Sequence, residues 1–368
     1  EGLGCDTFGP GELHAALASG IEPGRISVNG SVKDAALVTR AVEAGARLTL
    51  DSAAELDLAA AAAQATAKTA RIRLRLRPDY DDLVMPSDFD PSVTVRAGAH
   101  RYKPGIPLEQ AGDVARRALA TPGIELIGLM AHLGRHRADP DVWRAMAGSF
   151  AAAVGRVCAG LGGWRPSELD VGGGYPSPRD PIRNEPAPPI EDIAAALTSG
   201  LRAGLTAAGI DPAGIRLEAE PGRSLYADTG IQLARVRHLK EQTAPVPMRW
   251  VETDTTEMFM ADLLIEHAHF QFVPASRADA PQEQTADVVG MSCGFDLLVP
   301  DARLPALDSG DVLAFLDNGA YQDACASNFN GLPRPGTVLV SGSSAEWIKR
   351  PETVEDVFAR DVVPERLR

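Results

Sequence analysis

Three consecutive glycines, Gly172–Gly174, follow the run Glu168–Val171, which has the apolar-leaning character of a buried strand. Residues without a Cβ remove every side-chain obstacle, so another group can approach the backbone closely. A phosphate is one candidate, because successive backbone N–H groups and the positive end of a following helix can bind its oxygens. A mobile turn is the alternative that the triplet alone leaves open.

Polar residues also follow other strand-like runs in the first half of the chain. They are Asn29-Gly30, Asp51-Ser52, His132-Leu133-Gly134 and Glu220-Pro221-Gly222-Arg223. In a (β/α)8 barrel the loops after the strands converge on one face, and that face carries the active site. These residues are therefore the candidates for the chemistry of the protein.

The elements that must position them alternate strictly. The predicted strands are Gly4–Phe8, Arg25–Asn29, Leu48–Ser52, Arg71–Arg77, Ile124–Gly134, Glu168–Val171 and Ile215–Glu220. The predicted helices between them are Gly11–Ser19, Asp34–Ala44, Ala53–Ala67, Leu108–Leu119, Pro140–Leu161 and Ile190–Ala208. Such alternation predicts βα units around a parallel sheet.

Seven strands are one fewer than a closed barrel needs. We expect one βα unit to precede residue 1. The alternative is that one of the seven predicted strands is in fact two strands. After Glu220 the strands follow one another without long helices: Gly230–Lys240, Met248–Thr253, Phe270–Pro274, Ala286–Cys293, Asp311–Tyr321 and Thr337–Gly342. The sequence thus predicts an α/β (β/α)8-type barrel over residues 1–225 and a mainly antiparallel β-domain over residues 226–368.

Composition excludes several classes of protein. The 36 basic and 50 acidic residues give a formal net charge of −14, with no basic run, so a nucleic-acid binder is not expected. No apolar run approaches the roughly 18–20 residues that span a bilayer, and no secretion signal is visible. The four cysteines form no CxxC pair, which favours a reducing cytoplasm.

Five motifs in register carry a family resemblance. They are HLG at 132–134, LDVGGGYP at 169–176, EAEPGR at 218–223, Cys293 with Asp296 near it, and DNGAY at 317–321. Together they resemble the fold-type III pyridoxal-phosphate decarboxylases, the relatives of diaminopimelate and ornithine decarboxylase. The resemblance implies a barrel followed by a β-domain, a homodimer with shared active sites, pyridoxal 5'-phosphate as cofactor, and decarboxylation of an amino acid.

The resemblance also implies roles for individual residues. The phosphate would be bound by Gly172, Gly173, Gly174, Gly222, Arg223 and Tyr321. Glu220 would pair with the pyridinium nitrogen, since an anion raises the proton affinity of that nitrogen. Glu218, two residues earlier on the same face of the strand, is a less favoured substitute. His132 would stack on the cofactor ring, and Cys293 would reprotonate the product.

Each role has a plainer alternative. Arg223 could be a surface arginine, His132 a core histidine, Tyr321 an aromatic residue at a domain seam, and Cys293 a small buried hydrophobic residue. His267 and His269 would share one face of a strand, but no further ligands of suitable spacing accompany them, so no metal site is expected.

The chain departs from the family pattern at the Schiff-base lysine. That lysine lies on the first barrel strand in the family, and we expect it upstream of residue 1. Lys33, Lys68, Lys103, Lys240 and Lys349 are not assigned to the role. A lysine-less regulatory or binding homologue is the alternative.

The substrate residues depart from the pattern as well. Arg135 stands after HLG, where the family commonly has a small hydroxyl residue. The acid expected beside Cys293 is displaced to Asp296, and Asp254 matches another acidic substrate contact. An added cation and a missing anion change the field at the far end of the substrate. We therefore expect a distal group that is not a simple ammonium.

Overall fold

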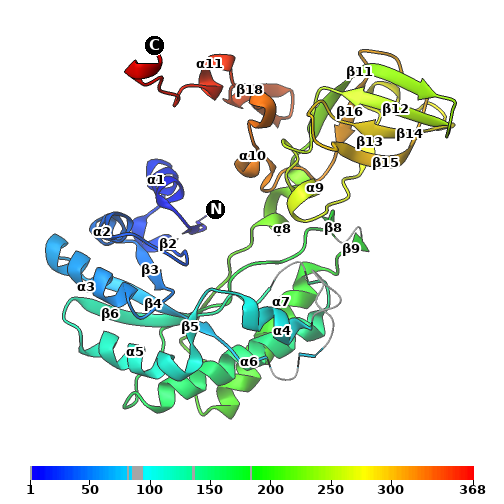
Figure 1. The fold of residues 1–368 in the computed structure, drawn as a ribbon. Helices are drawn as coiled ribbons and strands as arrows, with labels where there is room; N and C mark the ends of the chain where they lie inside the picture. Colours follow the sequence, from blue (N-terminus) through cyan, green and yellow to red (C-terminus); the bar gives the residue numbers. More distant parts are fainter. Residues whose placement is uncertain (1, 81–82, 85–93, 135–136, 183–184) are drawn as a thin grey trace. The chain divides into compact units, whose positions relative to one another are not determined.

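The computed structural model describes residues 2–80, 83–84, 94–134, 137–182 and 185–368 (Figure 1). The chain divides into two compact units, Glu1–Tyr175 with Pro188–Gly222, and Pro176–Ala187 with Arg223–Arg368. The segment Pro176–Ala187 belongs to the second unit because Ile182 packs against its core and the Pro181 carbonyl accepts the N–H of His269 at 2.6 Å.

The first unit is built on a parallel sheet in the order β1, β2, β3, β4, β6, β7, β10. The strands are β1 (Cys5–Thr7), β2 (Ile26–Val28), β3 (Arg47–Leu50), β4 (Ala70–Arg77), β6 (Ile124–Met130), β7 (Glu168–Asp170) and β10 (Arg216–Glu218). The short β5 (Ile106–Pro107) pairs with the end of β4. Every strand predicted for this half is present, which confirms the alternating barrel-type fold. Among the described residues, β1 and β10 are the edges of the sheet.

Helices cover the outside of this sheet. They are α1 (Pro10–Ala18), α2 (Ala35–Ala44), α3 (Glu55–Thr66), α4 (Val95–Arg101), α5 (Leu108–Ala120), α6 (Pro140–Ala159) and α7 (Ile190–Ala207). Figure 1 shows α2, α3, α5 and α6 following one another around the strands. The helix α4 was not predicted. Local signals set several boundaries: Asp34 caps α2 by accepting the N–H of Leu37, and Gly45 ends that helix in the left-handed conformation.

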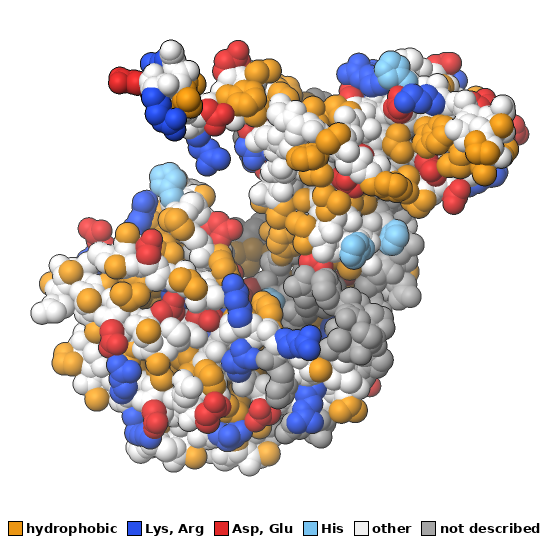
Figure 2. Space-filling view, viewed as in Figure 1, with side chains coloured by type: hydrophobic (Ala, Val, Ile, Leu, Met, Phe, Trp, Pro, Cys, Tyr) orange, Lys and Arg blue, Asp and Glu red, His pale blue; other side chains and the backbone are white. Residues whose placement is uncertain are grey.

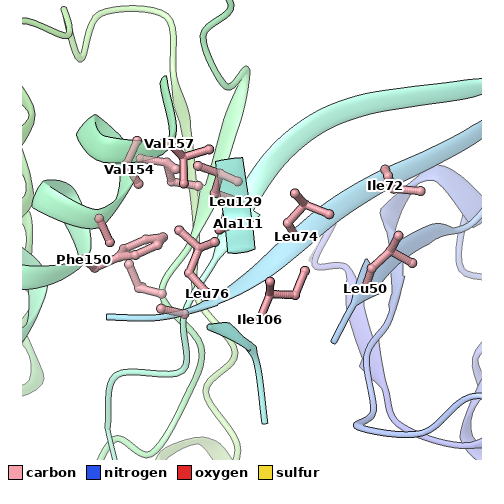
Figure 3. Close-up of a cluster of buried hydrophobic side chains, with 14 of the residues drawn as sticks. Leu50, Ile72, Leu74, Leu76, Ile106, Ala111, Leu129, Phe150, Val154 and Val157 are labelled. Carbon is pink, nitrogen blue, oxygen red and sulfur yellow. The ribbon is translucent and has the colours of Figure 1, made fainter. Parts of the chain in front are cut away.

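The two faces of the sheet differ in chemistry. Period-two alternation along β4 directs Ile72, Leu74 and Leu76 toward the helices, where they pack with residues such as Phe150 of α6 (Figure 3). The alternate residues, Arg73 and Arg75, occupy the opposite face and are also buried. A barrel interior is usually filled by branched apolar residues. Here the inner face is polar, and its side chains are described below.

The second unit contains a six-stranded sheet in the order β13, β16, β11, β12, β14, β15. The strands are β11 (Gln232–Gln242), β12 (Met248–Thr253), β13 (Phe272–Val273), β14 (Gln284–Val289), β15 (Leu297–Leu304) and β16 (Val312–Phe315). All pairs are antiparallel except β12 with β14, so the predicted mainly antiparallel sheet is present. A separate hairpin joins β17 (Thr337–Ser341) to β18 (Ser344–Lys349). The strands β15 and β18 were not predicted.

Short elements complete the second unit. They are β8 (Arg179–Asp180), β9 (Glu185–Pro186), α8 (Arg223–Tyr226), α9 (Asp262–Ile265), α10 (Gln322–Cys325) and α11 (Val354–Val357). Figure 2 shows basic and acidic side chains interspersed over the visible face of the first unit. Within the described part of the chain, no helix combines the length and apolarity needed to cross a bilayer.

Candidate active site

Three loops of the first unit meet at the ends of neighbouring strands. His132 follows β6, Gly172–Gly174 follow β7, and Glu220 follows β10. The N–H of Gly173 donates to His132 Nδ1 at 3.2 Å, and the N–H of Glu220 donates to the Gly172 carbonyl at 2.9 Å. His132 Nδ1 lies 4.0 Å from Glu220 Oε2. The sequence expectation that these residues gather at one face is met, because parallel strands place their ends at the same edge.

The glycine triplet is required by the protein's own packing. A Cβ on Gly172 would lie 2.6 Å from His132 Nδ1, and a Cβ on Gly173 would lie 2.2 Å from the carbonyl oxygen of Glu220. Gly172 also has a φ of +69°, which side chains disfavour. The N–H of Gly172 donates to Asp170 Oδ1 at 2.9 Å. Two of the three N–H groups thus donate to protein atoms, and phosphate binding by the triplet stays a prediction.

Glu220 lies in an acidic environment. Asn29 Nδ2 donates to Glu220 Oε1 and to Asp6 Oδ1, both at 2.5 Å. Burial raises the pKa of Glu220 well above its usual range, and the anions of Asp170 and Asp6 raise it further, while Arg73 opposes them. Desolvation and then the negative charge of Asp170 raise the pKa of Asp6 to about 7. Asp6 is exposed to solvent at the sheet edge, whereas the side chain of Glu220 is 12 % exposed.

An ionic network explains why Glu218 differs from Glu220. Glu218 Oε2 accepts from Arg73 Nη1 at 2.8 Å, and its other oxygen contacts Arg47. The network contains three arginines and three acids that face one another across the inner surface: Arg47, Arg73 and Arg216 with Glu168, Asp170 and Glu218. These six formal charges cancel. Glu218 is committed to this balance, whereas Glu220 lies beyond it.

Lys33 is buried and unsuited to reach a ligand. Its Nζ lies 2.8 Å from Glu55 Oε2 and donates to the Gly30 carbonyl at 2.7 Å. Burial lowers the pKa of Lys33, and Glu55 opposes that shift. Glu55 also accepts the N–H of Asp51 at 2.7 Å. This pair fastens the loops that follow β2 and β3.

Arg223 and Tyr321 meet within the second unit. The Arg223 side chain is buried, its Nη1 donates to Asp262 Oδ2 at 2.7 Å, and its Cζ lies 4.9 Å from the centre of the Tyr321 ring. Arg223 Nε is buried with no hydrogen-bond partner among the described residues. Burial raises the pKa of the Tyr321 phenol, and Arg223 partly offsets this shift. The alternative that Arg223 is a surface arginine is therefore excluded. Gly222, which precedes it, is half-buried.

The carboxylates of the two predicted substrate acids of the second unit already accept hydrogen bonds from neighbouring residues of that unit. Asp296 is 2 % exposed, and its carboxylate accepts from the N–H of Glu257 at 2.7 Å, the N–H of Ser292 at 2.6 Å and Thr256 Oγ1 at 3.1 Å. Asp254, two residues before Thr256, accepts the N–H of Arg235 and a donor from Arg237, each at 2.7 Å. Arg135 lies outside the described residues.

Cys293 is exposed in the loop after β14, so its alternative role as a small buried hydrophobic residue is excluded. His267 and His269 lie in the loop between α9 and β13 rather than on a strand. His267 has a φ of +53°. Over the ranges that the structure describes, no group of three or more His, Cys, Asp or Glu side chains could hold a metal ion.

Several site residues escaped sequence reasoning. Arg73 and Arg75 belong to the run RIRLRLR, whose strict alternation signals one charged face on a strand. The sequence places Asn29 among the polar residues that follow a strand and gives it no specific role. Asp262 and Gln322 carry no local signal, because their partner Arg223 lies far away in the sequence.

Comparisons with known proteins agree with one another. A family model described as the pyridoxal binding domain of pyridoxal-dependent decarboxylases matches residues 1–227. A diaminopimelate decarboxylase of Methanothermobacter thermautotrophicus is 30 % identical over 369 residues, covering all of this chain and 81 % of the relative. One from Archaeoglobus fulgidus is 29 % identical over all of the chain and 83 % of the relative. The crystal structure of diaminopimelate decarboxylase from M. jannaschii superposes with a TM-score of 0.89 at 26 % identity, over all of this chain and 81 % of that one.

Proposed function

The chain belongs to the pyridoxal-dependent decarboxylases, and from that premise we propose that its substrate is an amino acid or amino-acid conjugate whose distal group is not a simple ammonium. Membership confirms the resemblance drawn from the motifs. It makes the protein a pyridoxal-phosphate-dependent amino-acid decarboxylase. The identity of the distal group goes beyond this membership and is the proposal.

One observation carries the proposal: the carboxylate of Asp296 is buried and accepts three hydrogen bonds, one from its own loop and two from the loop after β12. A carboxylate so occupied has little capacity left for a substrate ammonium. Asp254 is likewise occupied by two donors. Both acids that would recognise a distal amine are thus committed elsewhere, and the sequence adds the cation Arg135. An acidic or acylated distal group suits this balance better than an ammonium.

The residues present fit pyridoxal phosphate. Arg223 Nε is a buried donor that has no acceptor in the described part of the chain, as an anion-binding group requires. Glu220 is a carboxylate whose acidic neighbours favour a proton or cation beside it. The two sets lie in different compact units, and their joint action on one cofactor is inferred from the family.

The residues then take the following roles. When bound, pyridoxal phosphate supplies a sink for the electrons left behind as the α-carboxylate departs. Glu220 would hold a proton at the pyridine nitrogen, and Asn29 fixes the orientation of that carboxylate. Arg223 and Tyr321, with Gly222 and the Gly172–Gly174 loop, would hold the phosphate. His132 would contact the ring, and Cys293 would supply the proton that the product takes up.

We further propose that the protein acts as a homodimer in the cytoplasm. Cys293 is exposed on the second unit. A thiol that protonates a reacting carbon has to lie in a binding site, and a second subunit would provide that site. In the proposed dimer, each β-domain completes the active site of the other subunit. Sedimentation of the full chain with and without pyridoxal phosphate tests the assembly.

Competitive turnover assays test the substrate class. Release of CO2 is measured with lysine, ornithine and diaminopimelate, and with N-acylated and carboxylate-bearing conjugates of diamino acids. We expect kcat/KM to be at least about tenfold higher for a conjugate, which corresponds to roughly 1.4 kcal/mol. A clear preference for a plain diamino acid would refute the proposal. No CO2 from any substrate, with no cofactor bound, would favour the regulatory alternative instead.

A further inference from the structure

The guanidinium of Arg223 has a hydrogen-bond partner at Nη1, and its Nε has none among the described residues. Asp262 accepts from Nη1 at 2.7 Å, and Tyr321 lies over the guanidinium plane with its ring centre 4.9 Å from Cζ. The Nε–H points into a buried position without an acceptor among the described residues. An unsatisfied buried donor is destabilising, so an arrangement that keeps one needs a compensating reason.

Gln322 forms hydrogen bonds with both the carboxylate and the backbone N–H of Asp262. Gln322 Nε2 donates to Asp262 Oδ2 at 2.7 Å and to the Ala320 carbonyl at 3.0 Å, while its Oε1 accepts the N–H of Asp262 at 3.1 Å. Asp262 is 3 % exposed and Gln322 is 2 % exposed. With so few alternative conformations, Asp262 keeps Arg223 in one orientation.

The backbone at Tyr321, next to Gln322, has a strained conformation that supports the same arrangement. Tyr321 has a φ of +68°, a left-handed conformation that is unfavourable for an aromatic residue. This conformation lets consecutive residues contribute to one group: the Tyr321 ring contacts Arg223, and the Gln322 amide contacts Asp262.

We propose that Asp262 and Gln322 are positioning residues, which hold Arg223 so that its Nε–H edge meets an oxygen of a phosphate monoester. The inference rests on the proposed function, in which Arg223 binds the cofactor phosphate. The planar guanidinium presents its donors in fixed directions, so occupying the Nη1 position decides which edge the phosphate meets.

The opposite role for Asp262 is also physically reasonable and gives the opposite sign. An anion paired with Arg223 competes with phosphate for the same cation, so a purely electrostatic account predicts that removing Asp262 tightens phosphate binding. Positioning predicts that Asp262→Ala weakens binding. It also predicts that Asp262→Asn, which keeps an acceptor for Nη1, retains it.

The test measures equilibrium binding of pyridoxal phosphate and of pyridoxal, which lacks the phosphate, to the full chain. For Asp262→Ala we expect the affinity for pyridoxal phosphate to fall about tenfold, the typical value of one hydrogen bond to a charged group. The affinity for pyridoxal should stay unchanged, and Asp262→Asn should remain within about twofold of the wild type. Asp323→Ala, at an exposed acid paired with Lys349, is the matched control and should change neither affinity.

Other outcomes are distinguishable. Tighter binding of pyridoxal phosphate by Asp262→Ala, or equal losses for both compounds, overturns the positioning role. If Asp262→Ala fails to fold, Gln322→Ala takes its place and should weaken pyridoxal phosphate alone by severalfold. If the wild-type chain binds pyridoxal as tightly as pyridoxal phosphate, the phosphate site itself is wrong, and the proposed function fails together with this inference.

Discussion

Asn330 contacts Cys293 at two points. Its Oδ1 accepts the N–H of Cys293 at 2.9 Å, and its Nδ2 donates to Sγ at 3.2 Å. Asn330 reaches this position with a φ of +60°, a conformation that asparagine tolerates better than most residues. The thiol, although exposed, therefore has a defined direction.

We expect Asn330→Gly to impair the protonation step that is assigned to Cys293. Glycine accepts the left-handed backbone, so the change removes only the side-chain clamp. The measured quantity is the fraction of product that is an amine protonated at the α-carbon, obtained by mass spectrometry of the products formed in D2O. For Asn330→Gly this fraction should fall between the wild-type value and that of Cys293→Ala. Cofactor affinity should be unchanged in both variants. A product distribution identical to the wild type for Asn330→Gly would show that the clamp has no part in the reaction.

Glu220 should make the cofactor-free protein less stable as the pH rises. The folded-state pKa of Glu220 lies above its usual value of 4.5, so the native state binds this proton more tightly than the unfolded state does. The stabilising contribution is complete below pH 4.5 and is lost as the pH rises through the folded-state pKa. Glu220→Gln should therefore raise Tm at pH 8, by about 2–4 °C for each kcal/mol relieved, and less at pH 5. It should also weaken cofactor binding.

Glu218→Gln is the matched control for that experiment. Glu218 is the last residue of β10, two residues before Glu220, and pairs with Arg47 and Arg73, so its neutralisation leaves buried cations with less compensation. We expect Tm to fall at both pH values. If Glu220→Gln lowered Tm at pH 8 as Glu218→Gln does, the acidic environment assigned to Glu220 would be incorrect.

Gly173→Ala should displace the glycine loop. The added Cβ would lie 2.2 Å from the Glu220 carbonyl oxygen, and a backbone atom cannot move aside cheaply. We expect destabilisation of about 1–3 kcal/mol by overpacking and a loss of cofactor affinity. Gly148→Ala provides the control, because this glycine lies in α6 with nothing within 4 Å of the added Cβ. It should stabilise the protein by about 0.5–1 kcal/mol. Urea denaturation of both variants measures the difference, and equal effects would contradict the packing argument.

Lys33→Met should destabilise the first unit by about 3–5 kcal/mol, because it leaves the buried Glu55 carboxylate without its cation. Adding Glu55→Gln in the same chain should restore part of the loss. Urea denaturation followed by tryptophan fluorescence measures both. A Lys33→Met protein of wild-type stability would show that the pair is not needed for folding.

The sequence alone determined the order and type of the elements. Alternating periods of two and of about 3.6 residues are local properties, so the seven parallel strands and the covering helices could be located from Gly4 to Glu220 without any tertiary information. The motif order likewise identified the family and its cofactor. Elements with weak local patterns were missed, such as α4 and the exposed hairpin strand β18.

Tertiary structure decided how individual residues are used. Glu218 and Glu220 are nearly equivalent in sequence, yet one balances arginines from β3 and β4 while the other faces Asp6 and Asp170. Asp296 resembles a substrate residue in sequence, but its carboxylate joins its own loop to the loop after β12. Charge and hydrogen-bonding capacity act through space over a few ångströms, between residues that the chain separates by tens to hundreds of positions. No pattern within a single segment carries that information.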